Sequence, residues 1–218
     1  MSTPNERHRF PVGTLLLAGL LAALMLLTYL LLRPPSPPDE LRGMLRSEFT
    51  PLAPFHLNSR SHGPIDREQL LGKWTLVSFG YRACGDPCAN TLHELAAFHR
   101  LLDDSGGDDA ARLQVLFVSV DPARDSEEAL AGYVAYFDPR FIGATAGQAA
   151  VERFARQFGA AFVDQAKTAP EQYAVSHSDE VFLVDPHARM VATFTPPLYA
   201  ATLLAQFESL AGYYGANG

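Results

Sequence analysis

The first hydrophobic pattern in this chain is a continuous run near its amino terminus. Val12 to Leu32 contains no charged residue. As a helix, these 21 residues would measure about 31 Å, roughly the thickness of a bilayer core. The run is apolar on every face, unlike a core helix of a soluble domain, and it is longer than the apolar part of a secretory signal peptide. We therefore predict an uncleaved transmembrane anchor over residues 12–32.

The charges that flank this run predict its orientation. Arg7 and Arg9 precede it, against the single acid Glu6. Because positively charged flanks stay in the cytoplasm, residues 1–11 are expected to form a cytoplasmic tail. The rest of the protein should then lie on the periplasmic or extracytoplasmic side of an inner (cytoplasmic) membrane, held there by a single pass.

A proline-rich segment follows the predicted anchor. Residues 34–38 read Pro-Pro-Ser-Pro-Pro, which favours an extended and semi-rigid spacer. We predict a linker over residues 33–48 and one folded domain over residues 49–218. A domain of that size can bury a core without disulfide staples.

The second hydrophobic pattern is an alternation of strand and helix signals within the domain. Trp74–Phe79 and Leu113–Val120 are short apolar runs, as expected for buried central strands. Between them, apolar residues recur every three or four positions on a helix that starts near Cys88, and this predicts a β-α-β unit. The face of that helix consists of Leu92, Leu95, Phe98, His99 and Leu102.

The remaining elements complete an α/β prediction. Further helices are expected over Ser126–Phe137, from a capping box of Thr145 and Gln148 to Gly159, and over Leu198–Leu210. Two strands are expected over Glu180–Asp185 and Met190–Phe194, joined by a turn. This order suggests a mixed sheet covered by helices.

Composition excludes some classes of function. The chain is 48% hydrophobic, which is incompatible with wholesale disorder. It carries 24 acidic against 17 basic residues, for a net charge of −7. Such a protein is a poor candidate for binding nucleic acid.

Candidate chemistry gathers where the first strand of the β-α-β unit ends. Cys84 and Cys88, the two cysteines of the chain, lie there. Loops at the carboxyl ends of strands in α/β sheets are where ligands collect. Asp86 followed by Pro87 resembles an N-cap followed by the first helical residue. This places Cys88 in the first helical turn, where the helix dipole would stabilise a thiolate.

Cysteine spacing alone leaves a metal site and a disulfide open. In a regular helix, residues four apart have Cβ atoms about 5–6 Å apart, whereas a disulfide needs about 3.8 Å. Gly85 and Pro87 interrupt regular helix, so the loop could also bring the two sulfurs together. A purely structural disulfide is less favoured, because so short a loop constrains little of the unfolded chain.

Two thiolates make an incomplete site for most metals, so a third ligand is sought among the seven histidines. His177 is the candidate, because it directly precedes the strand Glu180–Asp185 and can lean toward the ligand-binding end of the sheet. The others are expected not to be ligands: His8, His56, His62, His93, His99 and His187.

Several segments, taken in order, resemble the Sco/SenC family. The segments are Gly72-Lys73-Trp74, Phe79-Gly80-Tyr81 before Cys-x-x-x-Cys, Phe117 to Asp125, Phe137 to Gly143, and Ser176-His177-Ser178 before Phe182 to Pro186. The resemblance implies a thioredoxin-like fold and the role of a copper-binding, thiol-active assembly factor of cytochrome c oxidase.

The resemblance also implies copper ligands at Cys84, Cys88 and His177. Soft thiolates select Cu(I), and an imidazole completes a three-coordinate site. The same ligands could also bind Cu(II). This chain departs from the family where proline usually follows each cysteine, since Gly85 and Ala89 stand there. Ser176 replaces the aspartate that commonly precedes the histidine. Asp86 is interpreted as a helix cap rather than a ligand.

Two functions follow. The first is a membrane-anchored metallochaperone that delivers copper to an oxidase subunit, with other copper chaperones or thiol reductants as further partners. The second is a thiol-disulfide oxidoreductase, in which Cys84 and Cys88 form the catalytic redox pair. Only the first needs His177, and the presence of this residue favours copper handling. A peroxidase-like activity has no supporting motif around Cys84.

Overall fold

The computed structural model describes residues 12–32, 37–160, 162–163, 176–177 and 179–215. The helices among them are α1 (Val12–Leu32), α2 (Asp86–Ser105), α3 (Asp108–Arg112), α4 (Glu127–Ala135), α5 (Gln148–Phe158) and α6 (Ala200–Gly215), with short 3-10 turns η1 (Asp39–Leu41) and η2 (Glu68–Leu70). The strands are β1 (Leu45–Pro51), β2 (Leu57–Ser59), β3 (Gly63–Ile65), β4 (Trp74–Gly80), β5 (Leu113–Ser119), β6 (Ile142–Ala144), β7 (Phe162–Val163), β8 (Ser176–His177), β9 (Val181–Val184) and β10 (Arg189–Phe194).

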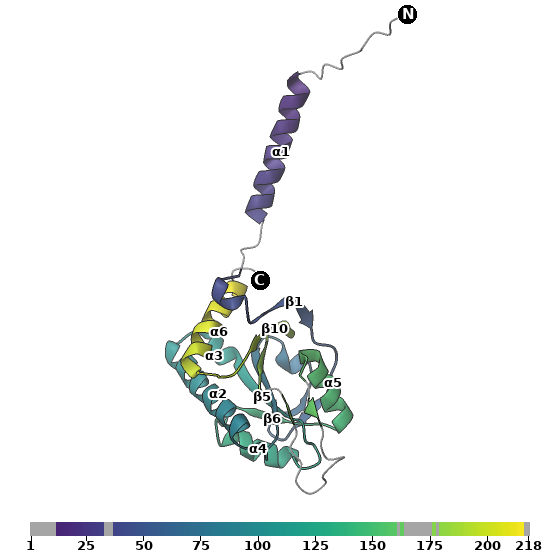
Figure 1. Cartoon of the computed structure of the whole chain (residues 1–218), viewed down its shortest axis with the longest axis vertical. Coiled ribbons are helices and arrows are strands. Elements are labelled where there is room, and N and C mark those ends of the chain that lie inside the picture. The colour runs from purple at the N-terminus through teal and green to yellow at the C-terminus, as the bar shows by residue number, and fades with distance from the viewer. Residues whose placement is uncertain (1–11, 33–36, 161, 164–175, 178, 216–218) are drawn as a thin grey trace, which may run out of the picture.

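A mixed six-stranded sheet forms the centre of the domain (Figure 1), with the strand order β1-β10-β9-β4-β5-β6. Strands β4, β5 and β6 are parallel, and the other pairings in this sheet are antiparallel. Every residue of β4 and β5 is buried, as expected for central strands covered on both faces. The predicted mixed sheet and its β-α-β unit are confirmed.

Helices and a hairpin cover the two faces of the sheet. One face packs against α2, α4 and α6, and all five residues of the predicted α2 stripe are buried there. The other face packs against α5 and the β2–β3 hairpin. Neighbouring residues of β4 point to opposite faces, so that Leu76 joins the first core and Val77 joins the second.

The predicted boundary of the domain at residue 49 falls inside β1 and is too late in the chain. Leu41 is fully buried against the first core, and β1 starts at Leu45 and pairs with β10. These residues lie in the segment that composition assigned to the linker. A single buried leucine and an edge strand with charged residues carry too little periodicity to be recognised before the sheet is known.

The start of α5 also differs from its prediction. The helix begins at Gln148 with Gly147 as its N-cap, two residues later than the N-cap Thr145 that the capping box indicated. Thr145 instead continues an extended segment, because its backbone exchanges hydrogen bonds with Asn58 at 2.7 and 3.0 Å. Strand β6, just before it, was not recognised in the sequence because it has only three residues.

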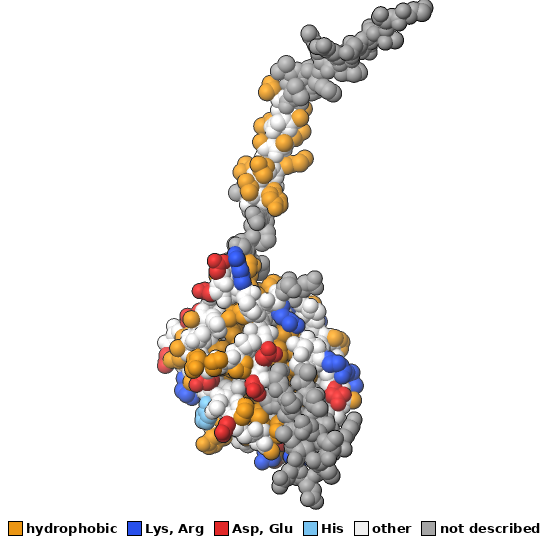
Figure 2. Space-filling view, in the orientation of Figure 1, with side chains coloured by type: hydrophobic (Ala, Val, Ile, Leu, Met, Phe, Trp, Pro, Cys, Tyr) orange, Lys and Arg blue, Asp and Glu red, His pale blue; other side chains and the backbone are white. Residues whose placement is uncertain are grey.

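Helix α1 occupies the residues of the charge-free run and stands apart from the domain (Figures 1 and 2). Its large hydrophobic side chains between Leu16 and Leu30 are exposed, for example Leu16 at 70% and Met25 at 71%. Among the described residues, no helix meets the combined length and hydropathy needed for a membrane crossing. The transmembrane assignment stays a prediction.

Candidate functional site

The site is built where β4 and β5 end side by side. The parallel register pairs Gly80 with Ser119, and Val120 N donates to Gly80 O at 2.8 Å, which extends the pairing by one residue. Two loops therefore leave the sheet next to each other. The first, residues 81–85, leads through Cys84 into α2, and the second, residues 120–126, leads into α4. We call them the cysteine loop and the aspartate loop.

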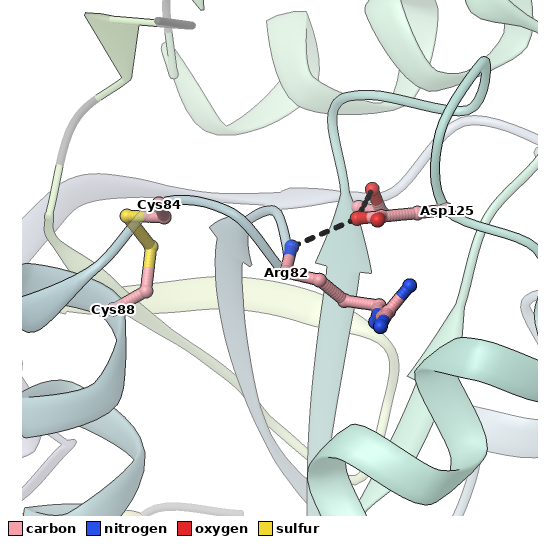
Figure 3. The surroundings of a disulfide bond; sticks show 5 residues. Arg82, Cys84, Cys88 and Asp125 are labelled. Atoms are coloured by element: carbon pink, nitrogen blue, oxygen red, sulfur yellow. Dashed lines mark hydrogen bonds between the residues drawn. A yellow bond between two sulfur atoms is a disulfide. The ribbon is translucent and has the colours of Figure 1, made fainter.

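Cys84 and Cys88 form a disulfide, with their Cα atoms 6.0 Å apart (Figure 3). Cys88 lies in the first turn of α2, as predicted, and is 4% exposed, whereas Cys84 lies in the cysteine loop and is partly exposed. The loop thus brings the two sulfurs together, which was one of the two alternatives that the spacing left open.

The cap of α2 is not the residue predicted from the sequence. Gly85 is the N-cap, with φ 82° and ψ −147°, and Asp86 is already the first helical residue. No side chain provides a capping hydrogen bond at this end of the helix. A positive φ is readily adopted by glycine, and proline, whose φ is fixed near −65°, is excluded. The glycine that departs from the family pattern is therefore required by the conformation of this loop.

Gly80 forms a floor beneath Cys88 that sequence analysis did not identify as functional. A Cβ atom on Gly80 would lie 2.9 Å from Cys88 Sγ and 2.7 Å from Phe117 Cε2. The aromatic ring and the sulfur thus occupy the space above a bare backbone. A glycine at the last position of a buried strand was the available signal.

Asp125 joins the two loops. It is 3% exposed, and its Oδ2 accepts hydrogen bonds from Arg82 N at 2.9 Å and from Ser119 Oγ at 2.7 Å (Figure 3). A second contact places the guanidinium of Arg124 5.6 Å from the ring centroid of Tyr81. Arg124 also pairs with Asp121, a second buried acid of the aspartate loop. Ser119, Asp121, Arg124 and Asp125 lie in the family-like segment Phe117 to Asp125, but their contacts with Tyr81 and Arg82 could be identified only from the folded structure.

Electrostatic surroundings differ between the site and the more distant histidine His99. Burial raises the pKa of Tyr133, and the negative charge of Asp125 raises it further, while the positive charge of Arg82 lowers it.

Burial lowers the pKa of His99, and the positive charge of the Arg140 guanidinium lowers it further, while the negative charge of Asp138 raises it. His99 is 2% exposed and lies on the core face of α2, so its predicted structural role agrees with its position.

His177, the predicted third ligand, is described only through its backbone. It belongs to β8, which pairs with β7 so that His177 stands opposite Phe162. Its side chain lies outside the described part of the structure. Within that part, His, Cys, Asp and Glu side chains form no group of three or more that could hold a metal ion. The ligand set of Cys84, Cys88 and His177 stays a prediction.

A surface groove of about 410 Å³ begins at the same end of α2. Its walls come from the start of α2, from Asp179 just before β9 and from the segment after β10, and they include Pro87, His93, Pro196, Pro197 and Leu198. His93 is exposed, and its ring packs edge-on against Phe137 with the ring centroids 4.9 Å apart. The groove therefore reaches Pro87, the residue next to Cys88, although neither cysteine lines it.

Comparison with known proteins relates the whole domain to one family. The model of the SCO1/SenC family matches residues 45–212. A protein of Stutzerimonas stutzeri is 30% identical over 160 residues, which are 73% of this chain and 76% of that protein. Mitochondrial Protein SCO2 of Saccharomyces cerevisiae is 33% identical over 139 residues, 63% of this chain and 45% of that protein. This chain thus spans about half the length of its mitochondrial relative.

A solved structure supports the fold. The crystal structure of yeast Sco1 with copper bound matches 75% of this chain and 89% of its own, at a TM-score of 0.68 and 28% identity. The thioredoxin-like prediction and the predicted family are therefore confirmed, and copper, the predicted metal, is bound in this relative.

Proposed function

The chain belongs to the SCO1/SenC family, and we propose that it binds copper through Cys84, Cys88 and His177 and delivers it to the copper centre of a cytochrome c oxidase subunit. The observation that carries this proposal is the cysteine pair at the open end of β4, with its two sulfurs brought together by the loop before α2. A relative of the same fold has been solved with copper bound.

The donor set suits copper as a cargo. Once the disulfide is reduced, two thiolates are available, and these soft ligands select Cu(I). Cys88 lies in the first turn of α2, where unpaired backbone amides and the helix dipole favour a negative sulfur. A neutral imidazole from His177 would complete three-fold coordination.

The disulfide itself supports a second candidate, a thiol-disulfide oxidoreductase. The reduced pair would act as a dithiol, and one thiolate would attack a partner disulfide to form a mixed disulfide. The other cysteine would then displace the partner, which leaves as a dithiol while Cys84–Cys88 forms. Two electrons and two protons pass to the partner in this sequence. The histidine has no role in it.

We also propose that α1 anchors the domain in the inner membrane, with the domain on its periplasmic or extracytoplasmic side. The support is the charge-free sequence, the arginines that precede it, and the exposure of the leucines from Leu16 to Leu30. At the base of β4, Trp74 contacts Tyr214 of α6, and η1 packs on the same helix. The cysteine pair follows the other end of β4, about 20 Å away, and so faces away from the segment that enters from α1.

Copper titration of the full chain in detergent tests the proposal. The reduced protein should bind one Cu(I) with both thiols consumed, and the oxidised protein should not. His177→Ala should weaken Cu(I) binding, while His187→Ala, a matched control at an exposed turn, should leave it unchanged. Equal Cu(I) affinity for His177→Ala and the unmodified chain would overturn the three-ligand site and favour the oxidoreductase.

A further inference from the structure

We propose that Asp125 is a positioning residue for the cysteine pair, because its buried carboxylate holds the backbone that leads into Cys84. This inference deepens the proposed function, since copper binding and thiol exchange use the same two sulfurs. Asp125 contacts neither sulfur in Figure 3. It acts through the backbone of Arg82, two residues before Cys84.

The carboxylate of Asp125 is held rigidly from the sheet side. Ser119, the last residue of β5, is fully buried and donates its hydroxyl to Asp125 Oδ2 at 2.7 Å. The Asp125 amide donates to Asp121 O at 3.0 Å, which closes the aspartate loop on itself. Asp121 N in turn donates to Ser119 Oγ at 3.2 Å. The acceptor oxygen is therefore anchored to the end of a central strand.

Asp125 Oδ2 fixes the path of the cysteine loop through a hydrogen bond to its backbone. Arg82 N donates to it at 2.9 Å, and Cys84 N donates to Tyr81 O at 3.1 Å, so residues 81–84 form one turn. A charged acceptor makes a stronger hydrogen bond to a backbone N–H than a neutral one does. Fixing Arg82 thus fixes the turn that presents the Cys84 sulfur.

The two sulfurs are held by different means. Cys88 is positioned by the first turn of α2, and its Sγ lies close enough to Gly80, the last residue of β4, that a Cβ there would be 2.9 Å from it. Cys84 belongs to the cysteine loop, where its side chain packs against the second core and its backbone is tethered through Arg82 N to Asp125. Freedom at Cys84 lowers the effective concentration of one thiol at the other, and therefore favours the dithiol over the disulfide.

Alanine and asparagine at position 125 separate geometry from charge. Asparagine retains a carbonyl oxygen that can accept from both Arg82 N and Ser119 Oγ, but it removes the negative charge. Alanine removes both. If position is what matters, asparagine restores the behaviour of the unmodified chain.

A matched control is available at Asp138. It is 4% exposed, and like Asp125 it accepts a hydrogen bond from a nearby backbone amide, that of Arg140, at 2.9 Å. Its other partners include His99, on the part of α2 far from the cysteines. Asp138→Ala therefore removes an equivalent buried acid without touching the cysteine loop.

The experiment equilibrates the full chain in detergent with reduced and oxidised glutathione. Two glutathione thiols reduce the Cys84–Cys88 bond and leave as glutathione disulfide, and alkylation followed by mass measurement gives the fraction of each form. For Asp125→Ala we expect the equilibrium constant to shift about tenfold toward the dithiol, equivalent to about 30 mV. Asp125→Asn and Asp138→Ala should stay within about threefold of the unmodified chain.

Three results would overturn the inference. These are an unchanged equilibrium for Asp125→Ala, an equal shift for Asp138→Ala, or a shift for Asp125→Asn as large as that for Asp125→Ala. If Asp125→Ala fails to fold, Ser119→Ala, which frees the carboxylate from the sheet, replaces it and should shift the equilibrium in the same direction by more than Asp138→Ala does. Because no copper is present, failure of copper binding leaves this test unaffected.

Discussion

The floor beneath the cysteine pair gives the sharpest prediction, Gly80→Ala. The added methyl carbon would lie 2.7 Å from Phe117 Cε2 and 2.9 Å from both Phe117 Cζ and Cys88 Sγ. Ordinary carbon contacts are at about 3.5–4.0 Å, so the ring and the sulfur must move by roughly half an ångström or more. Overpacking of this kind costs about 1–3 kcal/mol.

The neighbours of Gly80 have little room to give way. Phe117 is 1% exposed within the first core, and Gly80 O accepts the hydrogen bond from Val120 N that joins the two strands. We therefore expect Gly80→Ala to lower the free energy of unfolding by about 1–3 kcal/mol. Displacement of the Cys88 sulfur should also speed reduction of the disulfide, because a distorted bond is more reducible.

Denaturant unfolding and the rate of reduction by dithiothreitol measure the two effects. Gly132→Ala is the control, because this helical glycine of α4 has open space around its Cβ position and alanine should stabilise it by about 0.5–1 kcal/mol. In Gly80→Ala with Phe117→Leu, the combined destabilisation should be smaller than the sum of the two single effects. Unchanged stability and reduction rate in Gly80→Ala would refute the close packing of the floor.

The remaining predictions concern one loop and two buried polar groups. Gly85→Pro cannot adopt φ 82° and should lower the free energy of unfolding by more than about 1 kcal/mol and slow reformation of the disulfide, measured by thiol counting; normal refolding would contradict the helix start described above. Burial lowers the pKa of His99, so the unfolded chain takes up a proton at higher pH than the folded one, and stability should fall as pH drops below about 6.5. Comparing denaturant unfolding at pH 7.5 and 5.5 with that of His99→Gln checks this, and an identical pH dependence in the variant would exclude His99 as its source. Among the residues that the structure describes, Thr145 Oγ1 is buried without a hydrogen-bond partner. Thr145→Val should therefore raise the free energy of unfolding, measured by denaturant unfolding, by about 1 kcal/mol. A lower free energy of unfolding would show that the hydroxyl has a partner.

Local periodicity predicted the centre of the fold well and its edges poorly. Strands β4 and β5 and the buried face of α2 were recognised because each has a regular apolar pattern that is stable only when it is buried in the core. Strand β1 was missed because it is an edge strand whose residues include Arg46 and Glu48, and pairing with β10 rather than its own pattern makes it a strand. The capping-box prediction at Thr145 was wrong for the same reason, because the backbone of Thr145 forms hydrogen bonds with that of Asn58, which is distant in the sequence.

In the candidate site, too, the features set by neighbouring residues were predictable and those set by distant residues were not. Sequence alone determined that two cysteines would stand at the carboxyl end of a buried strand with Cys88 in the first helical turn, because strand, loop and helix start are set by neighbouring residues. It could not decide whether the two sulfurs come within bonding distance, because that depends on the backbone conformation at Gly85.

Only the tertiary structure decided what surrounds those cysteines. Asp125 is 41 residues beyond Cys84, and its hydrogen bond to Arg82 N exists because parallel pairing of β4 with β5 places the two loops side by side. Gly80 became a floor only when Phe117 from the neighbouring strand and Cys88 from the helix above came to share its space. Such contacts depend on the packing of elements distant in the chain, and no pattern of neighbouring residues encodes them.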